Sequence, residues 1–231
     1  MCGRFALDSK VDELIADFVG AGGDYREWTP SWNIAPTDPV IALFESAKPD
    51  APVERRAEIA RWSLVPSWSK EPKMRFPTFN ARAEELASKS IWKKPLASHR
   101  AIMPATGYYE WHTDETTGVK TPYFVHLPGE LIGMAGLYSW WRSPEDGEWM
   151  LTVTILTSDA VDQLVGIHDR NPVPLPRELW DWWVDPTITG DQTMADAAVK
   201  AALPVAESLE LYRVAPIRSS TVDGPQLIEP A

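Results

Sequence analysis

Residues 132–156 read IGMAGLYSWWRSPEDGEWMLTVTIL and contain two strand-like runs, 132–140 and 149–156, on either side of a charged segment with Pro and Gly. Apolar, aromatic and β-branched runs that flank such a segment are typical of paired strands. Comparable runs recur along the chain, at 40–44, 59–65, 101–103, 108–112, 123–127 and 209–214. Their succession, with turn-rich segments between them, predicts a mainly antiparallel sheet.

Helical patterns lie mostly outside these runs. Apolar residues at helical spacing predict a helix that is capped by Asp8 or Ser9 and ends at Gly20. Further helices are expected at 80–92, 158–164, 177–183 and 194–202. The segment 21–39 reads as an irregular loop, and the tail 219–231 as loosely held. We therefore expect a single α+β domain over residues 1–231, with a motif-bearing core at 2–175 and helices and a late strand at 176–218.

The composition is that of a globular protein, since 44% of the 231 residues are hydrophobic and 24% are charged. The single cysteine excludes an intramolecular disulfide and a cysteine-rich zinc site. No apolar stretch has the length of a signal segment or a membrane span. These features predict a cytoplasmic protein.

Charge is distributed unevenly along the chain. The net charge of −11 argues against a polyanionic partner, but residues 55–100 contain 11 Lys or Arg and 4 Glu. Two interpretations stay open for this segment: a basic face that binds phosphates, or a solvated surface of mixed charge. Most of the 12 tryptophans should be core residues. Trp68, which follows Pro66 in the basic segment, is the best candidate to stack on a nucleobase.

Cys2 is preceded by Met1 alone. Removal of Met1 would leave a 1,2-aminothiol at the N-terminus. Its amine, with a pKa of about 7.7–8.0, can condense with an aldehyde to an imine, and its thiol can then close a thiazolidine ring on the imine carbon. The alternative is a small buried residue near the start of a strand.

Glu110 lies within GYYEWH, residues 107–112. Strand alternation places Tyr108, Glu110 and His112 on one face, and Tyr109 and Trp111 on the other. A carboxyl group among aromatic residues of an interior strand is costly to ionise and suits general acid–base catalysis. On an edge strand, Glu110 would instead lie in water.

Three further candidate site residues lie in segments whose sequence is less specific for a function. His168, within GIHDRNP at 166–172, lies in a loop of the kind that presents side chains to a ligand. Asn80 and Arg82 lie at an expected helix start, where Asn80 either caps the helix or directs its amide at a reaction centre. Arg82 is a candidate to hold an anion. An ordinary turn network around His168 is the alternative.

Seven short motifs follow one another in this chain: MCGRF (1–5), WNIAPT (32–37), RWSLVPSW (61–68), NARAE (80–84), GYYEW (107–111), AGLY (135–138) and IHDR (167–170). Together they resemble the SRAP family of SOS-response-associated peptidases, or abasic-site processing proteins, over most of residues 2–175. The resemblance implies an SRAP-type fold: α+β, with a mainly antiparallel, barrel-like sheet core and peripheral helices.

The resemblance also implies a function. Such proteins use a mature N-terminal cysteine to capture the ring-opened aldehyde of an abasic site in single-stranded DNA, and the thiazolidine crosslink shields the lesion. Cys2 would be the nucleophile and Asn80 would position its amine. Glu110 would transfer protons during imine formation. His168 would assist sugar ring opening and crosslink reversal.

The resemblance implies a set of DNA contacts as well: Gly3, Arg4, Trp68, Arg82, Thr157 and Arg170. The arginines would hold phosphates next to the lesion, Thr157 would add a minor contact, and Trp68 would pack against a neighbouring base. The family name also implies peptidase activity, at least the removal of Met1 from the protein's own chain.

The expected partner is therefore single-stranded DNA with abasic sites, at the nucleoid. We expect a monomer that needs no cofactor, metal ion or membrane. Ser63, His112 and Asn171 depart from the family pattern, but none is a candidate catalytic residue. An N-terminal-nucleophile amidohydrolase is the chief alternative function, and it would need oxyanion donors rather than phosphate contacts. A Trp-rich binding module, which would not need Cys2, is the third.

Overall fold

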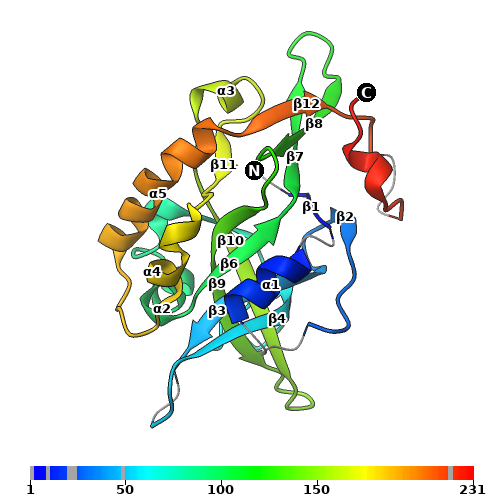
Figure 1. The fold of residues 1–231 in the computed structure, drawn as a ribbon. Coiled ribbons are helices and arrows are strands. Elements are labelled where there is room, and N and C mark those ends of the chain that lie inside the picture. Colours follow the sequence, from blue (N-terminus) through cyan, green and yellow to red (C-terminus); the bar gives the residue numbers. More distant parts are fainter. Residues whose placement is uncertain (1–2, 9–10, 20–24, 48–49, 218–220) are drawn as a thin grey trace.

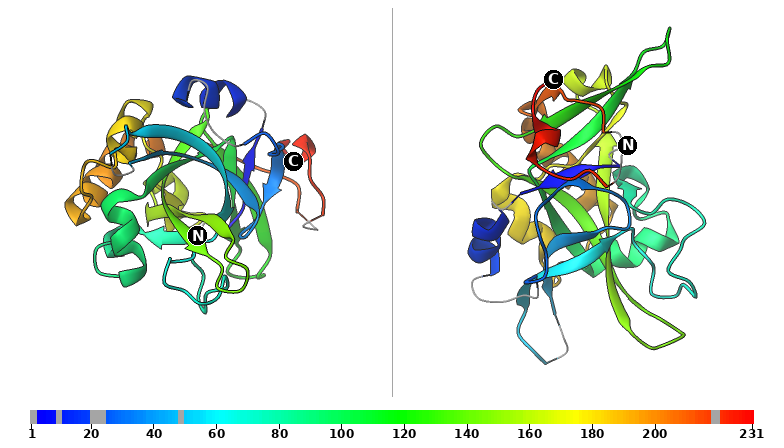
Figure 2. Two further views of the ribbon diagram at one scale, coloured as in Figure 1. Left: turned by 90° about the horizontal axis from the view of Figure 1, so that it is seen from below. Right: turned by 90° about the vertical axis from the view of Figure 1, so that its right-hand side faces the viewer.

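A closed five-stranded barrel forms the centre of the molecule (Figures 1 and 2). In this computed structural model, residues 3–8, 11–19, 25–47, 50–217 and 221–231 are described. The barrel strands are β3 (Pro39–Ser46), β4 (Glu54–Trp62), β6 (Arg100–Ala105), β9 (Ile132–Arg142) and β10 (Trp149–Asp159). They pair in the order β10–β4–β3–β6–β9, and β9 pairs with β10 to close the ring. All pairs are antiparallel except β4–β10.

A second sheet lies beside the barrel. Its order is β12 (Glu210–Arg213), β8 (Lys120–His126), β7 (Gly107–Thr113), β1 (Phe5–Leu7) and β2 (Ser31–Ile34). Two short strands extend the barrel at the end of β10: β5 (Asn80–Arg82) is parallel to it and β11 (Arg170–Pro172) is antiparallel. The segments that carry Asn80, Thr157 and Arg170 are therefore neighbours in one sheet.

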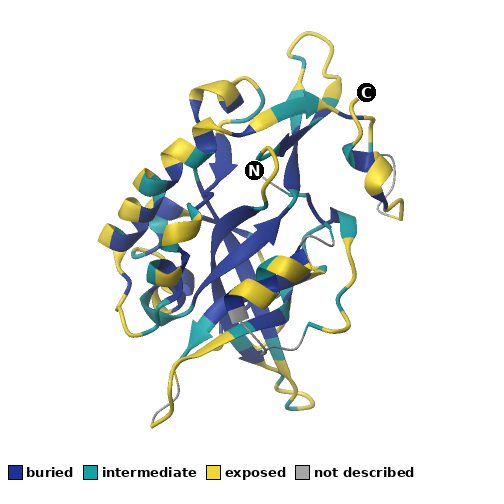
Figure 3. Cartoon of the chain, in the orientation of Figure 1, coloured by how far each residue is buried: buried dark blue, intermediate teal, exposed yellow. Residues whose placement is uncertain are grey.

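The helices lie on the outside of the barrel. In the described residues they are α1 (Val11–Val19), α2 (Ser90–Ser98), α3 (Asp162–Val165), α4 (Trp180–Val184) and α5 (Gln192–Glu207). Figure 1 shows α2, α4 and α5 together on one side of the barrel. Short 3₁₀ turns occupy Ala83–Glu85 (η1), Arg177–Leu179 (η2) and Pro225–Ile228 (η3). Figure 3 shows buried barrel strands and exposed outer helix faces. The prediction of an α+β fold with a mainly antiparallel barrel and peripheral helices is confirmed.

Two sequence-based helices are wrong in detail. Residues 80–92 are not one helix, because Asn80–Arg82 is extended and pairs with β10, and α2 begins at Ser90. Ser158 does not cap a helix, since it remains in β10 opposite Asn171, and α3 begins at Asp162. In both places, pairing with a distant strand prevails over local helical pattern.

Two segments expected to be irregular are ordered in the structure. Within 21–39, β2 pairs with β1, and Phe5 lies opposite Ile34. Residues 221–231, part of the tail expected to be loose, pack on the second sheet. Leu227 is buried there, and the Tyr212 hydroxyl donates to the Ile228 carbonyl at 2.6 Å. Burial of Leu227 explains why the tail is held.

Candidate active site

Glu110 is buried in the middle of the second sheet, with 5% of its surface exposed. Its strand, β7, lies between β1 and β8, so the interior position expected for this carboxyl is confirmed. Alternation places Tyr108 in the main core, while Tyr109 and Trp111 belong to a second apolar cluster. Burial raises the pKa of Glu110, and the nearby charge of His168 opposes that shift. Glu110 therefore holds its proton more tightly than a carboxyl group in water.

The start of the described chain runs along β7 toward Glu110. Phe5 lies opposite Tyr108, and the Tyr109 N–H donates to the Arg4 carbonyl at 2.9 Å. If this antiparallel register continues by one residue, Gly3 lies opposite Glu110. Met1 and Cys2 are outside the described residues, so the predictions for Cys2 have no structural counterpart here.

His168 is near Glu110, although 58 positions separate them in the chain. It lies in the turn between α3 and β11. Its Nδ1 accepts a hydrogen bond from the Arg170 backbone N–H at 3.0 Å and lies 2.7 Å from Asp169 Oδ1. The first contact requires Nδ1 without a proton and the second requires Nδ1 with one, so this nitrogen has a partner in either arrangement. The acid–base role of His168 stays a prediction.

Arg170 is buried and is held by carboxylates from two other segments. Its Nη2 donates to Glu84 Oε2 at 2.9 Å and to the Thr157 carbonyl at 2.6 Å, while Nη1 contacts Glu84 Oε1 and Asp159 Oδ1. The hydrogen bond from Arg170 lowers the pKa of Glu84. Thr157 is fully buried beside this guanidinium. A phosphate that binds Arg170 would thus have to share the guanidinium with these carboxylates or displace them. The role of Arg170 in DNA binding stays a prediction.

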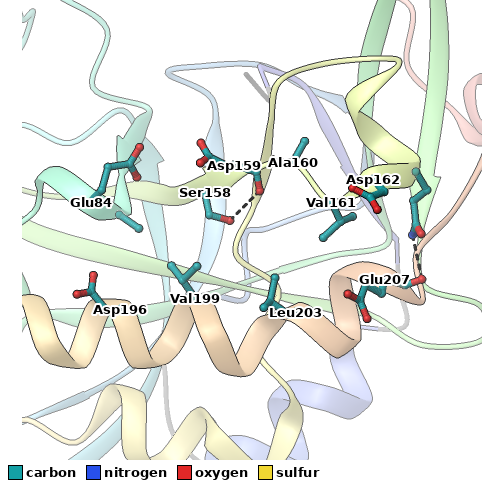
Figure 4. A pocket seen from close by; sticks show the side chains of 12 residues that line it. Glu84, Ser158, Asp159, Ala160, Val161, Asp162, Asp196, Val199, Leu203 and Glu207 are labelled. Carbon is teal, nitrogen blue, oxygen red and sulfur yellow. Dashed lines mark hydrogen bonds between the residues drawn. The ribbon is translucent and has the colours of Figure 1, made fainter.

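Glu84 and Asp159 also line an open groove of about 800 Å³ between α5 and the end of β10 (Figure 4). Further carboxylates lie along it: Asp162, Asp196 and Glu207. Within the part of the chain that the structure describes, no Lys or Arg side chain lines this groove. Its charge is therefore unsuited to a DNA backbone.

Arg4 is fixed by the motif around Asn33. Its Nη1 donates to the side-chain oxygen and, at 3.4 Å, to the backbone carbonyl of Asn33. The Asn33 amide in turn donates to the Val222 carbonyl at 2.6 Å. Sequence reasoning gave Asn33 no role, although WNIAPT was one of the motifs on which the family resemblance rests. Its position as the partner of Arg4 is visible only once β1 and β2 are paired.

Arg82 and Trp68 are both exposed, but at different places. Arg82 ends β5, and its side chain makes no hydrogen bond or ion pair within the described part of the chain. Trp68 is 64% exposed and lines a cavity with Ser139 and Trp149, near the opposite end of β10 from Thr157. The structure therefore separates Trp68 from the segments that carry Arg82, Thr157 and Arg170.

The basic segment 55–100 divides into structural and exposed cations. Arg100 is fully buried and donates only to backbone carbonyls, including those of Leu96 and Trp183. Arg55 pairs with Glu45 and Asp181, at 2.9 Å each. The other exposed Lys and Arg side chains of the segment are Lys70, Lys73, Arg75, Arg82, Lys89, Lys93 and Lys94.

The family model "SOS response associated peptidase (SRAP)" matches residues 1–218. The chain belongs to this family. An SRAP relative, the abasic site processing protein YoqW of Bacillus subtilis, is 35% identical over 99% of each chain. The abasic site processing protein HMCES of Gallus gallus is 33% identical over 84% of this chain and 60% of its own length. A Bacteroides thetaiotaomicron structure aligns over the whole of both chains with a TM-score of 0.81 at 22% identity, which shows the shared fold.

One SRAP departure has a structural role here. Asn171 is buried, accepts a hydrogen bond from the Val161 N–H at 3.1 Å and donates to the Pro172 carbonyl at 2.6 Å. No cluster of metal-ligating side chains occurs among the described residues. Nor is any helix in the described segments long and apolar enough to cross a bilayer.

Proposed function

We propose that this SRAP protein processes abasic sites in single-stranded DNA by covalent capture on a mature N-terminal Cys2. The observation that carries the proposal is the register of β1 on β7, which directs the start of the chain toward buried Glu110. His168 lies near the same carboxyl group. The names of the relatives, abasic site processing proteins, support the same substrate.

The capture reaction needs only the aldehyde and the aminothiol. The amine adds to the sugar C1′ carbonyl, the resulting hydroxyl leaves as water, and an imine forms. The thiol sulfur then adds to the imine carbon while its proton passes to nitrogen, which gives the thiazolidine. The overall change is loss of one water. It requires no cofactor or metal ion.

Glu110 is suited to the proton transfers in this sequence. A carboxyl whose pKa is raised by burial can donate its proton to the departing hydroxyl, and the carboxylate can then take the proton from the thiol. His168 would take the proton that the closed sugar must lose to open, since it lies near Glu110 and its Nδ1 has a partner with or without a proton. Asn80 would orient the amine.

Binding of the DNA would use the exposed cations and the chain start. Arg82 and Arg4 would contact phosphates beside the lesion, with Gly3 close to the sugar. Arg170 and Thr157 would contribute where a phosphate shares the guanidinium with Glu84. The protein would act as a monomer on DNA in the cytoplasm, at the nucleoid. In this proposal the peptidase activity of the family name is the removal of Met1.

The test uses mature protein and a single-stranded oligonucleotide with one abasic site. A heat-stable band of lower mobility is expected, and Cys2→Ala should abolish it. Cys2→Ser should give a weaker, reducible adduct, because oxygen closes the ring less favourably than sulfur. An oligonucleotide with a tetrahydrofuran residue, which has no aldehyde, is the matched control. Capture by Cys2→Ala at the wild-type rate would refute the proposal, and amide hydrolysis without capture would favour the amidohydrolase.

A further inference from the structure

A cavity of about 230 Å³ lies between α2, the loop after β4 and the β9–β10 hairpin. Half of the residues that line it are aromatic or basic: Trp68, Lys94, His99, Tyr138, Trp140 and Trp149. Trp68 is 64% exposed and Trp149 is 61% exposed. Contiguous exposed apolar surface on a globular protein generally serves binding. The cavity is smaller than the ~300–1,000 Å³ typical of sites for drug-sized ligands, which suits a single ring system.

Two cations lie at this cavity, and among the described residues no carboxylate lines it. The Arg142 guanidinium lies 5.8 Å from the centre of the Trp149 ring, and Lys94 is exposed on α2. His99 contacts Tyr138 edge-on, with ring centres 4.9 Å apart, and its Nδ1 is 2.9 Å from Ser98 Oγ. Burial lowers the pKa of His99, which favours its neutral ring. Aromatic faces with nearby cations match an unpaired nucleobase and its phosphate.

The route from the candidate active site to the cavity is basic. The chain from Pro66 to Phe79 leads from the cavity to Asn80, and Lys70, Lys73 and Arg75 are exposed along it. Two contacts fix this excursion: the Trp141 indole N–H donates to the Ser69 carbonyl at 2.9 Å, and the Leu64 N–H donates to the Thr78 carbonyl at 3.1 Å. In contrast, the larger groove beside Arg170 is acidic (Figure 4). A phosphate backbone is therefore favoured on the side of the aromatic cavity.

Strand geometry gives the distance between the cavity and the Thr157 end of β10. Ser139, which lines the cavity, pairs with Thr152, five residues before Thr157 on β10. At ~3.4 Å per strand residue, Ser139 is about 17 Å from Thr157 along β10, and Trp149, the first residue of that strand, is about 27 Å from it. Stacked nucleotides advance ~3.4 Å each, so these distances correspond to about five to eight nucleotides of DNA.

We propose that this cavity holds one unpaired nucleobase of the lesion-bearing strand, stacked on Trp149 beside Trp68, with Lys94 on the adjoining phosphate. The ligand rests on the proposed function, and the inference adds a second contact point several nucleotides from the abasic site. Trp149 and Lys94 would thus select a DNA strand that is single-stranded for several nucleotides beside the lesion.

A first experiment measures equilibrium affinity for undamaged single-stranded oligodeoxythymidine by fluorescence anisotropy, so that Cys2 chemistry takes no part. Trp149→Ala should weaken binding about tenfold, Trp149→Phe should retain most of it, and Lys94→Ala should lower the salt dependence by about one ion. Val119→Ala, an exposed apolar change in the β7–β8 turn, is the control. Equal affinity of Trp149→Ala and wild type would overturn the proposal.

A second experiment locates the base. Oligonucleotides with one abasic site carry 2-aminopurine at successive positions on either side, and fluorescence is read after capture. Quenching should peak at one position within about eight nucleotides of the lesion and disappear in Trp149→Ala. Uniform quenching at every position would overturn the cavity proposal while capture itself stands. Absence of capture by wild type, with Trp149-dependent binding of undamaged DNA retained, would instead refute the proposed function and support the cavity.

Discussion

Glu110 is buried on the interior strand β7 and lies near His168. Its raised pKa keeps the neutral acid available to higher pH than in water, and it is lost as pH rises through that value. Glu110→Gln keeps the shape but cannot exchange a proton, so capture of the abasic site should slow by about 100-fold with little change in DNA affinity. Rapid-quench kinetics and anisotropy measure the two quantities. Equal capture rates would remove Glu110 from the mechanism.

The same burial makes a stability prediction of definite sign. A carboxyl whose pKa is raised on folding stabilises the folded state most below its unfolded pKa, and this contribution is lost as pH rises through the folded pKa. Glu110→Gln should therefore gain stability relative to wild type at pH 8, and the gain should shrink as pH falls toward 4.5. Thermal unfolding across this pH range tests it. A constant difference would contradict the assigned cause of the shift.

Glu84 acts through Arg170, whose backbone N–H contacts His168. Glu84→Ala leaves a buried guanidinium with fewer partners and should lower the free energy of unfolding by about 1–2 kcal/mol, because Glu84 itself is about half exposed. The pKa of Glu84 is lowered on folding, so this loss should be full at pH 7 and disappear as pH falls through the folded pKa. Asp162→Ala, in the same groove, is the control for urea unfolding. An equal loss of stability in both variants would contradict the stabilising role of the Glu84–Arg170 contact.

At the scale of elements, apolar strands were predictable and short paired segments were not. The apolar and β-branched residues of β9 and β10 predict strands from their own sequence alone. Asn80–Arg82, in contrast, reads as helical because Ala83, Leu86 and Ile91 follow at helical spacing, and only the contact with β10 makes it a strand. In the same way, the motif residues were visible in sequence, but the Arg170–Glu84 and Arg4–Asn33 contacts join segments 86 and 29 positions apart.

A substitution that loosens the ordered tail should lower both the stability of the protein and its affinity for DNA. Leu227 is buried against the second sheet, and the neighbouring Val222 carbonyl holds the Asn33 amide. Leu227→Ala should lower the free energy of unfolding by about 2–3 kcal/mol and weaken DNA binding through Asn33 and Arg4. Urea titration and anisotropy measure these effects, with exposed Val222→Ala as control. A Leu227→Ala protein of unchanged stability would show that the tail is loosely held after all.

At the scale of the whole molecule, the net charge is −11, and the groove beside α5 gathers several carboxylates, while exposed cations lie outside its lining. Exposed Arg82 should contribute one phosphate contact, so Arg82→Ala should weaken DNA binding and reduce the slope of log affinity against log salt by about one. Arg213→Ala, exposed on β12, should leave both unchanged. Anisotropy titrations at several salt concentrations measure the slope. Identical slopes for Arg82→Ala and wild type would exclude Arg82 from the interface.

The most direct test of the proposed chemistry is the intact mass of the protein after incubation with an abasic-site oligonucleotide. The adduct should begin at Cys2, weigh as much as protein plus oligonucleotide less one water, and resist borohydride as a thiazolidine does. Chains that retain Met1 should stay unmodified in the same sample. Adducts on Met1-bearing chains, or on Cys2→Ala protein in equal yield, would contradict capture by the N-terminal amine and thiol.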